Sequence, residues 1–430
     1  MRPPTVSTKL AQIAKQSREN PKMVFTTLAH LMDVEFLMVA FRSLRKDAAV
    51  GIDKVTVAAY AANLEENLWE LYQKLKTNRY RAQMVRRVWI DKADGSKRPL
   101  GILVLEDKIV QKAVSMILGA VYEPMFYDFS YGFRPGRSPH QALSKLREEC
   151  CTKNIGWIVD ADISGFFDSI DHNHLRTIIK RRVNDGALLR LIGKWLNVGV
   201  LEEGRITYNE TGTPQGGVIS PILANIFLHS ILDNWFEQTA RPRLLGKCFI
   251  VRFADDFVLG FEHQTDAERV YEAIQRRFKL FGLTIHPTKS KIIQFTNPFR
   301  NKGNNPETFD FLGFTHYWSK TRQGGWAIKR KTRKKSLNRA MRSIWVWCKY
   351  NRHKLIREQY QKLRIKLLGH YQYFGIRGNY KMLEVIFEHT EKTWKKWLGR
   401  RTRNGSISWE KFEKKYRTLF LLPKPRITRS

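Results

Sequence analysis

Apolar residues along the chain follow two different spacings. Residues 1–80 are mostly helical in pattern, because LAHLMDVEFLMVAFRSLRKD carries apolar residues three and four positions apart. Residues 335–356, 357–376 and 381–399 repeat this helical spacing. Between these segments lie short runs rich in β-branched and aromatic residues, which are typical of strands. The pattern therefore predicts helical segments on both sides of a middle part that contains strands.

Two strand-like runs lie on either side of Asp255 and Asp256. Residues 249–254, FIVRFA, and residues 257–261, FVLGF, each predict a strand, and the polar step between them predicts a hairpin tip. Two carboxylates would then lie side by side at the edge of a buried sheet. Asp is also a common turn residue, so this stretch alone leaves a purely structural explanation equally open.

A second acidic strand changes the balance between these explanations. Residues 155–163, IGWIVDADI, predict a strand in which alternation places Asp160 and Asp162 on one face. A third carboxylate beside Asp255 and Asp256 would make a site whose like charges repel unless a cation is bound. Hard oxygen ligands without nearby Cys or His favour Mg²⁺ over zinc. Two Mg²⁺ ions in such a site stabilise the attacking and leaving oxygens of a phosphoryl transfer.

Two further hairpins are predicted, one on each side of these strands. Residues 85–105 contain VRRVWI and KRPLGI, joined by a turn at Asp94 and Gly95. Lys97 and Arg98 lie just beyond this tip, where cations suit a triphosphate or are merely solvated. In residues 309–318, FDFLGFTHYW, Gly313 marks the bend of the other hairpin.

Two loops have compositions that suit nucleic acid or nucleotide. Arg134 and Arg137 alternate with aromatic residues in YGFRPGR, which suits stacking and phosphate contacts with a single strand. The alternative is a loop that closes over the next helix, which a capping box at Ser138 begins. Residues 212–221, GTPQGGVISP, form the most specific loop, since Gly216 and Gly217 permit close backbone approach. Gln215 in that loop offers a donor and an acceptor at one point.

Composition adds a partner to this picture. The 430 residues suffice for two or three domains, and a hydrophobic content of 43% can bury a core. The formal net charge of +36 indicates a polyanionic partner, either nucleic acid or an anionic membrane surface. No apolar run approaches the roughly 18 residues of a membrane span, and the first residues lack a secretory signal. The four cysteines form no CxxC pair, which fits a reducing, intracellular setting.

Most of the positive surplus lies beyond residue 314. Residues 315–430 hold 32 Lys and Arg against six Asp and Glu, which is +26 of the net charge. The apolar faces of the helices predicted here take most Trp and Leu into a core. Their opposite faces are basic throughout, as in a site that follows a nucleic-acid backbone. Within this region KRKTRKK, at 329–335, is either part of that site or a solvated tether.

Several of these motifs together resemble one known family. DISGFFD at 162–168, GTPQGGVISP at 212–221 and FADD at 253–256 resemble the reverse transcriptases encoded by group II introns. GIDKVT at 51–56, YGFRPGRSPHQAL at 131–143 and LLGHYQYFGIRGNY at 367–380 extend the resemblance over roughly residues 25–428. Phe253 stands where the family usually has Tyr, and because the ring is kept we expect activity to survive. LPKPRITRS supplies no paired cysteines, so we expect the form without the HNH endonuclease found in some relatives.

The resemblance implies an α+β fold of the right-hand polymerase type. Its parts would be an N-terminal extension with fingers (1–155), a palm with catalytic aspartates (156–315) and a basic helical thumb and maturase domain (316–430). It implies an RNA-directed DNA polymerase that binds a group II intron RNA, assists its splicing and copies it into DNA during intron mobility. Two alternatives stay open: a domesticated relative in DNA repair or defence, and a splicing-only maturase.

The resemblance also implies roles for individual residues. The catalytic metal ligands would be Asp162, Asp255 and Asp256. The nucleotide would be bound by Lys97, Arg98, Phe167, Gln215 and Lys289, with Phe167 beneath the sugar and Lys289 near the triphosphate. Template or intron RNA would contact Arg134, Arg137, Gly216, Gly217, Lys329, Arg330, Lys331, Arg333, Lys334 and Lys335. Leu312 and Gly313 would form the primer grip.

The implied cofactors are two Mg²⁺ ions, with Mn²⁺ as a substitute. The implied partners are a group II intron RNA, an RNA template, a DNA primer and deoxynucleoside triphosphates. The expected location is a bacterial-type cytoplasm, in association with nucleic acid and with no membrane partner.

Overall fold

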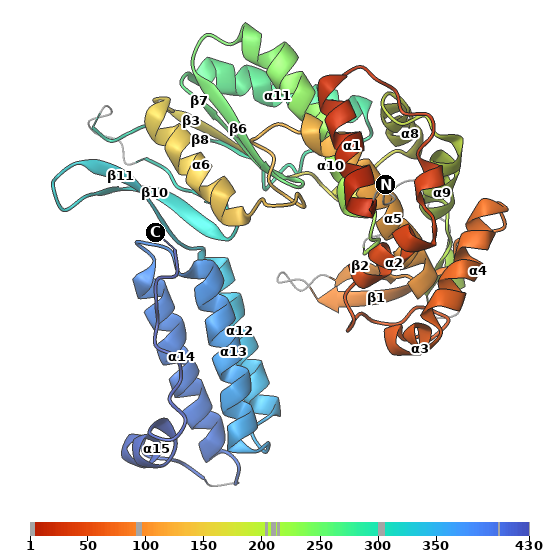
Figure 1. Ribbon diagram of the computed structural model, residues 1–430. Helices are drawn as coiled ribbons and strands as arrows, with labels where there is room; N and C mark the ends of the chain where they lie inside the picture. The colour runs from red at the N-terminus through yellow and green to blue at the C-terminus, as the bar shows by residue number, and fades with distance from the viewer. Residues whose placement is uncertain are drawn as a thin grey trace. The chain divides into compact units, whose positions relative to one another are not determined.

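The computed structural model describes residues 5–91, 97–202, 205–207, 212, 216–299, 306–402 and 405–429. Its contacts divide the chain into two compact units, residues 1–292 and 293–430 (Figure 1). Each unit combines helices with largely antiparallel sheets, so the predicted α+β class is confirmed. The finer division into three domains, at 1–155, 156–315 and 316–430, stays a prediction.

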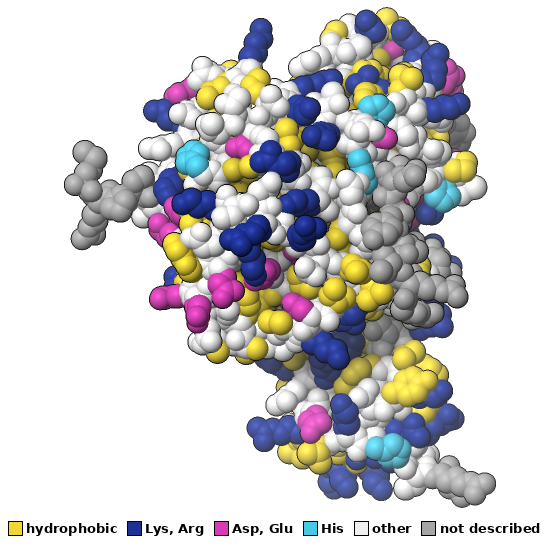
Figure 2. Space-filling model, turned by 90° about the vertical axis from the view of Figure 1, so that its right-hand side faces the viewer, with side chains coloured by type: hydrophobic (Ala, Val, Ile, Leu, Met, Phe, Trp, Pro, Cys, Tyr) yellow, Lys and Arg dark blue, Asp and Glu magenta, His cyan; other side chains and the backbone are white. Residues whose placement is uncertain are grey.

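The surface reflects the net charge of +36. On the face shown in Figure 2, Lys and Arg side chains are spread widely, while Asp and Glu side chains form a few small groups. Such a surface favours a polyanionic partner. Among the described residues, no helix is both long enough and apolar enough to cross a membrane.

Helices form most of the first 80 residues, as the apolar spacing predicts. Several helices of the first unit begin at a residue whose side chain accepts a hydrogen bond from an N–H of the first turn. Thr5, Asp33 and Asp171 are examples. The capping box predicted at Ser138 is present, with Gln141 as its partner. The helices of the first unit are α1 (Val6–Glu19), α2 (Val34–Arg42), α3 (Val57–Ala62), α4 (Leu64–Lys76), α5 (Leu105–Tyr122), α6 (Pro139–Thr152), α7 (Phe166–Ser169), α8 (His172–Lys180), α9 (Gly186–Leu196), α10 (Ser220–Leu228) and α11 (Gln264–Leu280).

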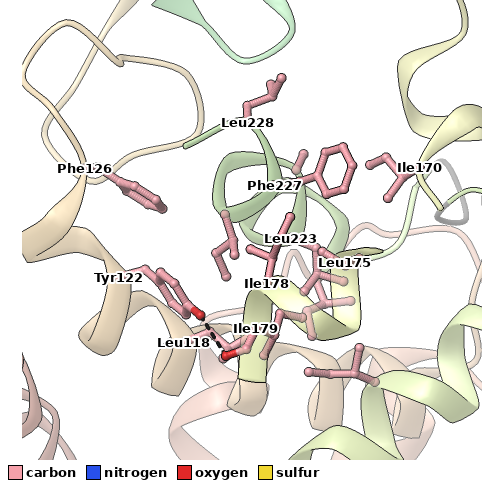
Figure 3. Packing of buried hydrophobic residues seen from close by; sticks show 14 of the residues in the cluster. Leu118, Tyr122, Phe126, Ile170, Leu175, Ile178, Ile179, Leu223, Phe227 and Leu228 are labelled. Carbon is pink, nitrogen blue, oxygen red and sulfur yellow. Dashed lines mark hydrogen bonds between the residues drawn. The ribbon is translucent and has the colours of Figure 1, made fainter. Parts of the chain in front are cut away.

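The core of the first unit is organised around α5. The sequence predicts a short apolar helix at 109–118, and the helix extends four residues further at each end. It is buried over most of its surface and packs against α1, α2 and α10. Figure 3 shows side chains of α5, α8 and α10 meeting in this core, where the Tyr122 hydroxyl donates to the Ile179 carbonyl at 3.1 Å. Each fully buried Leu or Ile here contributes about 1.5–3 kcal/mol.

The sheet that carries the acidic strands has the order β6–β7–β3–β8. Its strands are β3 (Trp157–Ala161), β6 (Cys248–Phe253), β7 (Asp256–Phe261) and β8 (Lys291–Gln294). The predicted hairpin around Asp255 and the predicted strand at 155–163 are both confirmed. Nearly every residue of β6 and β7 is buried, so both faces of these strands are covered. Full burial explains why the two runs, apart from Arg252, are apolar throughout rather than alternating.

The second sheet of the first unit has the order β2–β1–β4–β5. Its strands are β1 (Val85–Asp91), β2 (Lys97–Ile102), β4 (Val200–Glu202) and β5 (Arg205–Thr207). The predicted hairpin at 85–105 is confirmed by the antiparallel pairing of β1 with β2. Its tip, including the turn predicted at Asp94 and Gly95, lies outside the described residues. Gly51 packs against the base of this hairpin, since a Cβ there would lie 2.6 Å from the Cα atom of Val104.

The second unit joins a three-stranded sheet to a group of helices. The sheet has the order β11–β10–β9, and the hairpin predicted at 309–318 is confirmed. Its elements are β9 (Phe309–Phe311), β10 (Phe314–Lys320), β11 (Trp326–Thr332), α12 (Lys334–Tyr350), α13 (Ile356–Phe374), α14 (Tyr380–Gly399) and α15 (Trp409–Phe412). Leu363, Leu367, Ile386 and Trp394 are among the residues of its core, so the helical predictions for this region are confirmed.

KRKTRKK is not a tether, because it belongs to regular structure. Residues 329–332 are the end of β11, and Lys334 and Lys335 are the first residues of α12. Arg333 connects the two elements and donates its main-chain N–H to the Gly313 carbonyl at 3.0 Å. The backbone of all seven residues is therefore fixed within the second unit.

The buried His316 in β10 predicts that the second unit loses stability in acid. Burial, and then the charge of Arg330 on β11, lower the pKa of His316 from 6.5 to about 3. The ring stacks on Phe309 at 4.8 Å. Below about pH 6.5 this histidine binds a proton in the unfolded chain but not in the folded protein. The free energy of unfolding therefore falls by about 1.4 kcal/mol per pH unit down to about pH 3.

Urea unfolding of the full chain between about pH 7 and pH 4 measures this dependence. The variant His316→Phe should show a shallower loss of stability, although His370, whose pKa burial lowers to about 4, contributes in the same direction. The matched control is the variant His353→Gln, which changes an exposed histidine. Its stability should depend on pH as that of the wild type does. Identical pH profiles for His316→Phe and wild type would contradict the prediction.

Candidate active site

Strand pairing brings the acidic residues of two distant segments to one end of a sheet. In the antiparallel pair of β3 and β7, Ala161 lies opposite Phe257. Asp162 follows Ala161 and Asp256 precedes Phe257, so the register places Asp162 beside Asp256. Asp255 adjoins Asp256 on the turn between β6 and β7.

Residues 286–290 hold Asp162 through its backbone and its side chain. The main-chain N–H of Asp162 donates to Ser290 Oγ at 3.0 Å, and the Asp162 carbonyl accepts the His286 N–H at 2.8 Å. Lys289 Nζ lies 3.3 Å from Asp162 Oδ2. Because both of these side chains are about half exposed, solvent screens the ion pair. The predicted triphosphate lysine and the predicted metal ligand are therefore in contact.

The two aromatic residues after Asp162 have different environments. Phe166 is buried in the core of the first unit, while Phe167 is only partly buried and packs edge-on against it, with centroids 5.3 Å apart. Gly165, with a φ of 55°, starts the short helix α7 that carries both rings. Of the two, Phe167 is the ring with a surface left for a ligand.

Gly212 lies against α7, and Gly216 lies against β2. A Cβ on Gly212 would lie 2.8 Å from the Asp168 Cα atom, and one on Gly216 would lie 2.5 Å from the Gly101 carbonyl oxygen. Both glycines have positive φ angles, of 93° and 105°. His172 Nε2 lies 2.6 Å from the Gly212 carbonyl oxygen. Close approach and left-handed backbone therefore both require glycine at these two positions.

The structure describes only part of the remaining residues predicted to contact the nucleotide. Lys97 is exposed and, with Arg98, begins β2, the strand that the Gly216 backbone approaches. The Arg98 side chain and all of Gln215 lie outside the described residues. Gly217 is buried beside the exposed Gly216.

The burial of Arg134 argues against its predicted contact with the template. Its side chain is only 4% exposed and pairs with Glu123 at 2.8 Å. It also donates to the carbonyls of Tyr127 and Ser130, at 2.6 and 2.7 Å. The guanidinium is therefore used inside the protein, as in the alternative reading of a loop that closes over a helix. Arg137 keeps some exposure while pairing with Asp128.

The hairpin tip at Leu312 and Gly313 is held by other residues of the second unit, and its role as a primer grip stays a prediction. Leu312 and Gly313 both have positive φ angles, of 47° and 81°. The Tyr373 hydroxyl donates to the Leu312 carbonyl at 2.9 Å. The tip is thus a rigid turn whose two residues remain partly exposed.

The six predicted cations at 329–335 divide into three groups. Arg330 was predicted to contact RNA, but it is buried in β11. It is a structural residue that lies opposite His316. Lys329 is partly buried and donates to the Lys320 carbonyl at 3.0 Å, and Arg333 is also partly buried. The exposed cations are Lys331, Lys334 and Lys335. Further along α12, which contains no acidic residue, Arg339 and Arg342 are exposed as well.

Comparison with known proteins identifies the class to which this fold and site belong. The profile of the family described as reverse transcriptase (RNA-dependent DNA polymerase) matches residues 90–316, which is more than half of the chain. The chain belongs to this reverse transcriptase family. The matched range includes Asp162, Asp255 and Asp256 as well as the loop at 212–217.

Three curated relatives show how far the similarity extends. The chain is 40% identical over 231 residues to the group II intron-encoded protein LtrA of Lactococcus lactis subsp. cremoris, covering 53% of this chain and 38% of LtrA. It is 38% identical over 252 residues to protein YkfC of Escherichia coli K12, covering 51% and 66%. It is 30% identical over 355 residues to an uncharacterized 91 kDa protein in the cob intron of Schizosaccharomyces pombe, covering 69% and 43%. The chain thus spans less than two thirds of each relative.

The three aspartates have the donor chemistry of a divalent metal site. Reverse transcriptases generally use divalent metal ions. Carboxylate oxygens are hard ligands that suit such ions, and Asp162 already holds a cation, the Lys289 ammonium. Among the described residues, no three His, Cys, Asp or Glu side chains lie close enough together to form a ready ligand set.

The resemblance implies that Phe167 selects the sugar, and the partial exposure of this ring leaves it available to a nucleotide. If the ring lies beneath the incoming sugar, it collides with a 2′-hydroxyl, so Phe167→Ala should raise the ratio of ribonucleotide to deoxynucleotide incorporation by roughly tenfold or more. The ratio is measured by primer extension with each nucleotide type. Phe166→Leu, which alters a core ring, is the matched control and should leave the ratio unchanged. A folded Phe167→Ala protein with the wild-type ratio would rule out this position.

Proposed function

We propose that this chain is an RNA-directed DNA polymerase whose catalytic carboxylates are Asp162, Asp255 and Asp256. One observation carries the proposal: the pairing of β3 with β7 sets Asp162 beside Asp256 in a member of the reverse transcriptase family. The substrates would be deoxynucleoside triphosphates, and the partners an RNA template and a DNA primer.

The three aspartates would hold two Mg²⁺ ions, with Mn²⁺ as a substitute. When bound, such ions stabilise the charge on the attacking and leaving oxygens of phosphoryl transfer. The protein contributes fixed carboxylates at the end of a buried sheet. Lys289, which lies 3.3 Å from Asp162 Oδ2, would act on the triphosphate as a cation or as the acid that protonates the departing pyrophosphate.

The nucleotide pocket would lie between α7 and β2. Gly212 lies against α7, which carries Phe167, and Gly216 lies against β2, which begins at Lys97 and Arg98. An aromatic ring, a glycine-rich backbone and two cations suit the sugar, the base and the triphosphate respectively. Gln215 would also bind the nucleotide, and Gly217 and Arg137 would contact the template.

The second unit would bind RNA through phosphate contacts. It holds a net charge of +26 beyond residue 314, and its α12 carries exposed cations without any acid. The exposed cations follow one another along the chain. Lys331 lies at the end of β11, and Lys334, Lys335, Arg339 and Arg342 lie on α12. A one-sign surface of this kind follows a phosphate backbone and reads shape rather than sequence. Leu312 and Gly313 would meet the primer end.

The natural RNA would be a group II intron, which the protein would help to splice and copy into DNA during intron mobility. The names of relatives support this, since LtrA is a group II intron-encoded protein and the Schizosaccharomyces pombe protein lies in the cob intron. Over 89 residues the chain is also 30% identical to nuclear intron maturase 1 of Arabidopsis thaliana. We place this activity in a bacterial-type cytoplasm.

Loss of the turn carboxylates should abolish synthesis. Replacing both Asp255 and Asp256 by Asn should lower primer extension on an RNA template by roughly a thousandfold, because several kcal/mol of charge stabilisation is lost with the metal ligands. The exposed Asp47 supplies the matched control, Asp47→Asn, which should extend normally. Robust, metal-dependent extension by the double variant would overturn the assignment.

Removal of exposed cations should weaken RNA binding without lowering the rate of DNA synthesis. The triple change of Lys331, Lys334 and Lys335 to Gln should weaken intron RNA binding and flatten its dependence on salt by roughly 2 in log–log slope, since each lost phosphate contact accounts for about 0.7–0.9. Filter binding at several salt concentrations measures both quantities. Extension on a saturating short template at low salt should persist.

The matched control removes three cations from a helix of mixed sign. Lys381, Lys392 and Lys396 lie on α14 together with three glutamates, and Lys392 pairs with Glu388 at 3.2 Å. Changing these three to Gln should alter the salt slope much less. Equal slopes for both triple variants would mean that net charge alone, rather than the β11–α12 surface, binds the RNA.

A further inference from the structure

Arg252 is a fully buried cation in the otherwise apolar strand β6. Its guanidinium makes a bidentate pair with Asp233, with Nε 2.8 Å from Oδ1 and Nη2 2.5 Å from Oδ2. Both side chains are fully buried. Asp233 ends a π-helical turn, His229–Asp233, that directly follows α10. Burial alone would raise the pKa of Asp233, but Arg252 and His229 outweigh it and hold that pKa below its ordinary value.

The remaining nitrogen of this guanidinium reaches the turn that carries the catalytic aspartates. Arg252 Nη1 donates to the Ala254 carbonyl at 3.0 Å and to Asn225 Oδ1 at 3.0 Å. The Ala254 carbonyl belongs to the peptide group that leads into Asp255. Arg252 is therefore joined to the main chain immediately before the two carboxylates.

Asn225 connects the same guanidinium to the opposite side of the turn. Its Nδ2 donates to the Gly132 carbonyl at 2.8 Å. Gly132 lies directly on the turn, since a Cβ there would be 2.2 Å from the Ala254 nitrogen. Next to it, the Tyr131 N–H donates to the Arg252 carbonyl at 2.8 Å. The turn is thus held both by the Arg252 guanidinium and by the segment around Gly132.

The backbone of the turn needs this support. Ala254 has a φ of 58°, in the left-handed region that costs a residue with a Cβ about 1–2 kcal/mol. A residue holds such a conformation when its surroundings fix it, and here they are the Arg252 hydrogen bond and the Gly132 contact. A buried Arg–Asp pair adds little net stability by itself, so its geometric contribution is the larger one.

We propose that Arg252, held by Asp233 and Asn225, is a positioning residue for the Asp255–Asp256 turn, and that it sets where the two carboxylates meet the metal ions. The inference rests on the proposed polymerase function. Displacement of reacting groups by about 1 Å costs roughly a hundredfold in rate. The chain should therefore lose rate and metal affinity when Arg252 is removed, even if it folds.

The test replaces the whole ion pair so that no unpaired charge is buried. The double variant Arg252→Met with Asp233→Leu should fold, because buried ion pairs are replaceable by apolar residues of similar volume. Its kcat for primer extension should fall by roughly a hundredfold while the KM for the nucleotide changes little. Mn²⁺ affinity, measured by electron paramagnetic resonance of free Mn²⁺ without any substrate, should weaken by roughly tenfold.

A second variant and a control separate positioning from folding. Asn225→Leu keeps the Arg252–Asp233 pair and should give smaller losses in the same two readouts. Arg182 is also buried, and it donates to Ser17 and to the carbonyls of Asn20 and Pro21, none of which is in the turn. Arg182→Met should therefore lower stability and leave the Mn²⁺ affinity and kcat unchanged.

The outcomes distinguish this inference from the proposed function. If wild type extends primers and folded forms of both turn variants match it in kcat and Mn²⁺ affinity, positioning by Arg252 is overturned. If Arg182→Met weakens Mn²⁺ binding as much as they do, the effect is one of general stability and the inference fails. If wild type does not extend primers, the polymerase proposal fails, and the Mn²⁺ titration alone decides whether Arg252 positions the carboxylates.

Discussion

The antiparallel pairing of β3 with β7 is the contact on which the candidate active site depends. Asp162 is separated from Asp256 by more than 90 residues, and only the register that sets Ala161 opposite Phe257 brings them together. A slip of one residue would turn every side chain of β3 to the other face of the sheet. Such a slip is unfavourable because it would carry Asp160 into the fully buried positions of Val159 and Ala161 on β3. The hydrophobic core thus determines the position of the charged groups.

Close backbone contacts extend this constraint from the carboxylates to the proposed nucleotide pocket. Gly132 lies against the Asp255–Asp256 turn, Gly212 against α7 and Gly216 against β2, each at a distance that excludes a Cβ. These contacts occur where polar loops must approach strands or helices that are already packed, so they leave little freedom to the loops. Glycine loses more backbone freedom on folding than any other residue, so these contacts carry an entropic cost that the surrounding packing offsets.

Strands, helices and hairpins could be predicted from the sequence because each has a local pattern. The hairpins around Asp255 and Gly313, the capping box at Ser138 and the helices beyond residue 333 all follow from spacing and turn chemistry. The role of Arg252 was missed, although one signal was present: a lone cation in a run of apolar strand residues must be paired when both faces are covered. Its partners Asp233 and Asn225 could not be found, since they come from another segment and their contact is tertiary.

The same limit explains why cation counts overstate a nucleic-acid surface. Arg134 and Arg330 look like binding residues in sequence because Arg is usually exposed, yet both are buried in the fold. Arg134 satisfies backbone carbonyls of its own loop, and Arg330 shares the interior of a small sheet with His316. Burial of a guanidinium depends on which carbonyls or rings surround it, and a linear sequence does not contain that information. Exposed residues on an acid-free element such as α12 are therefore a better measure of an RNA surface than net charge.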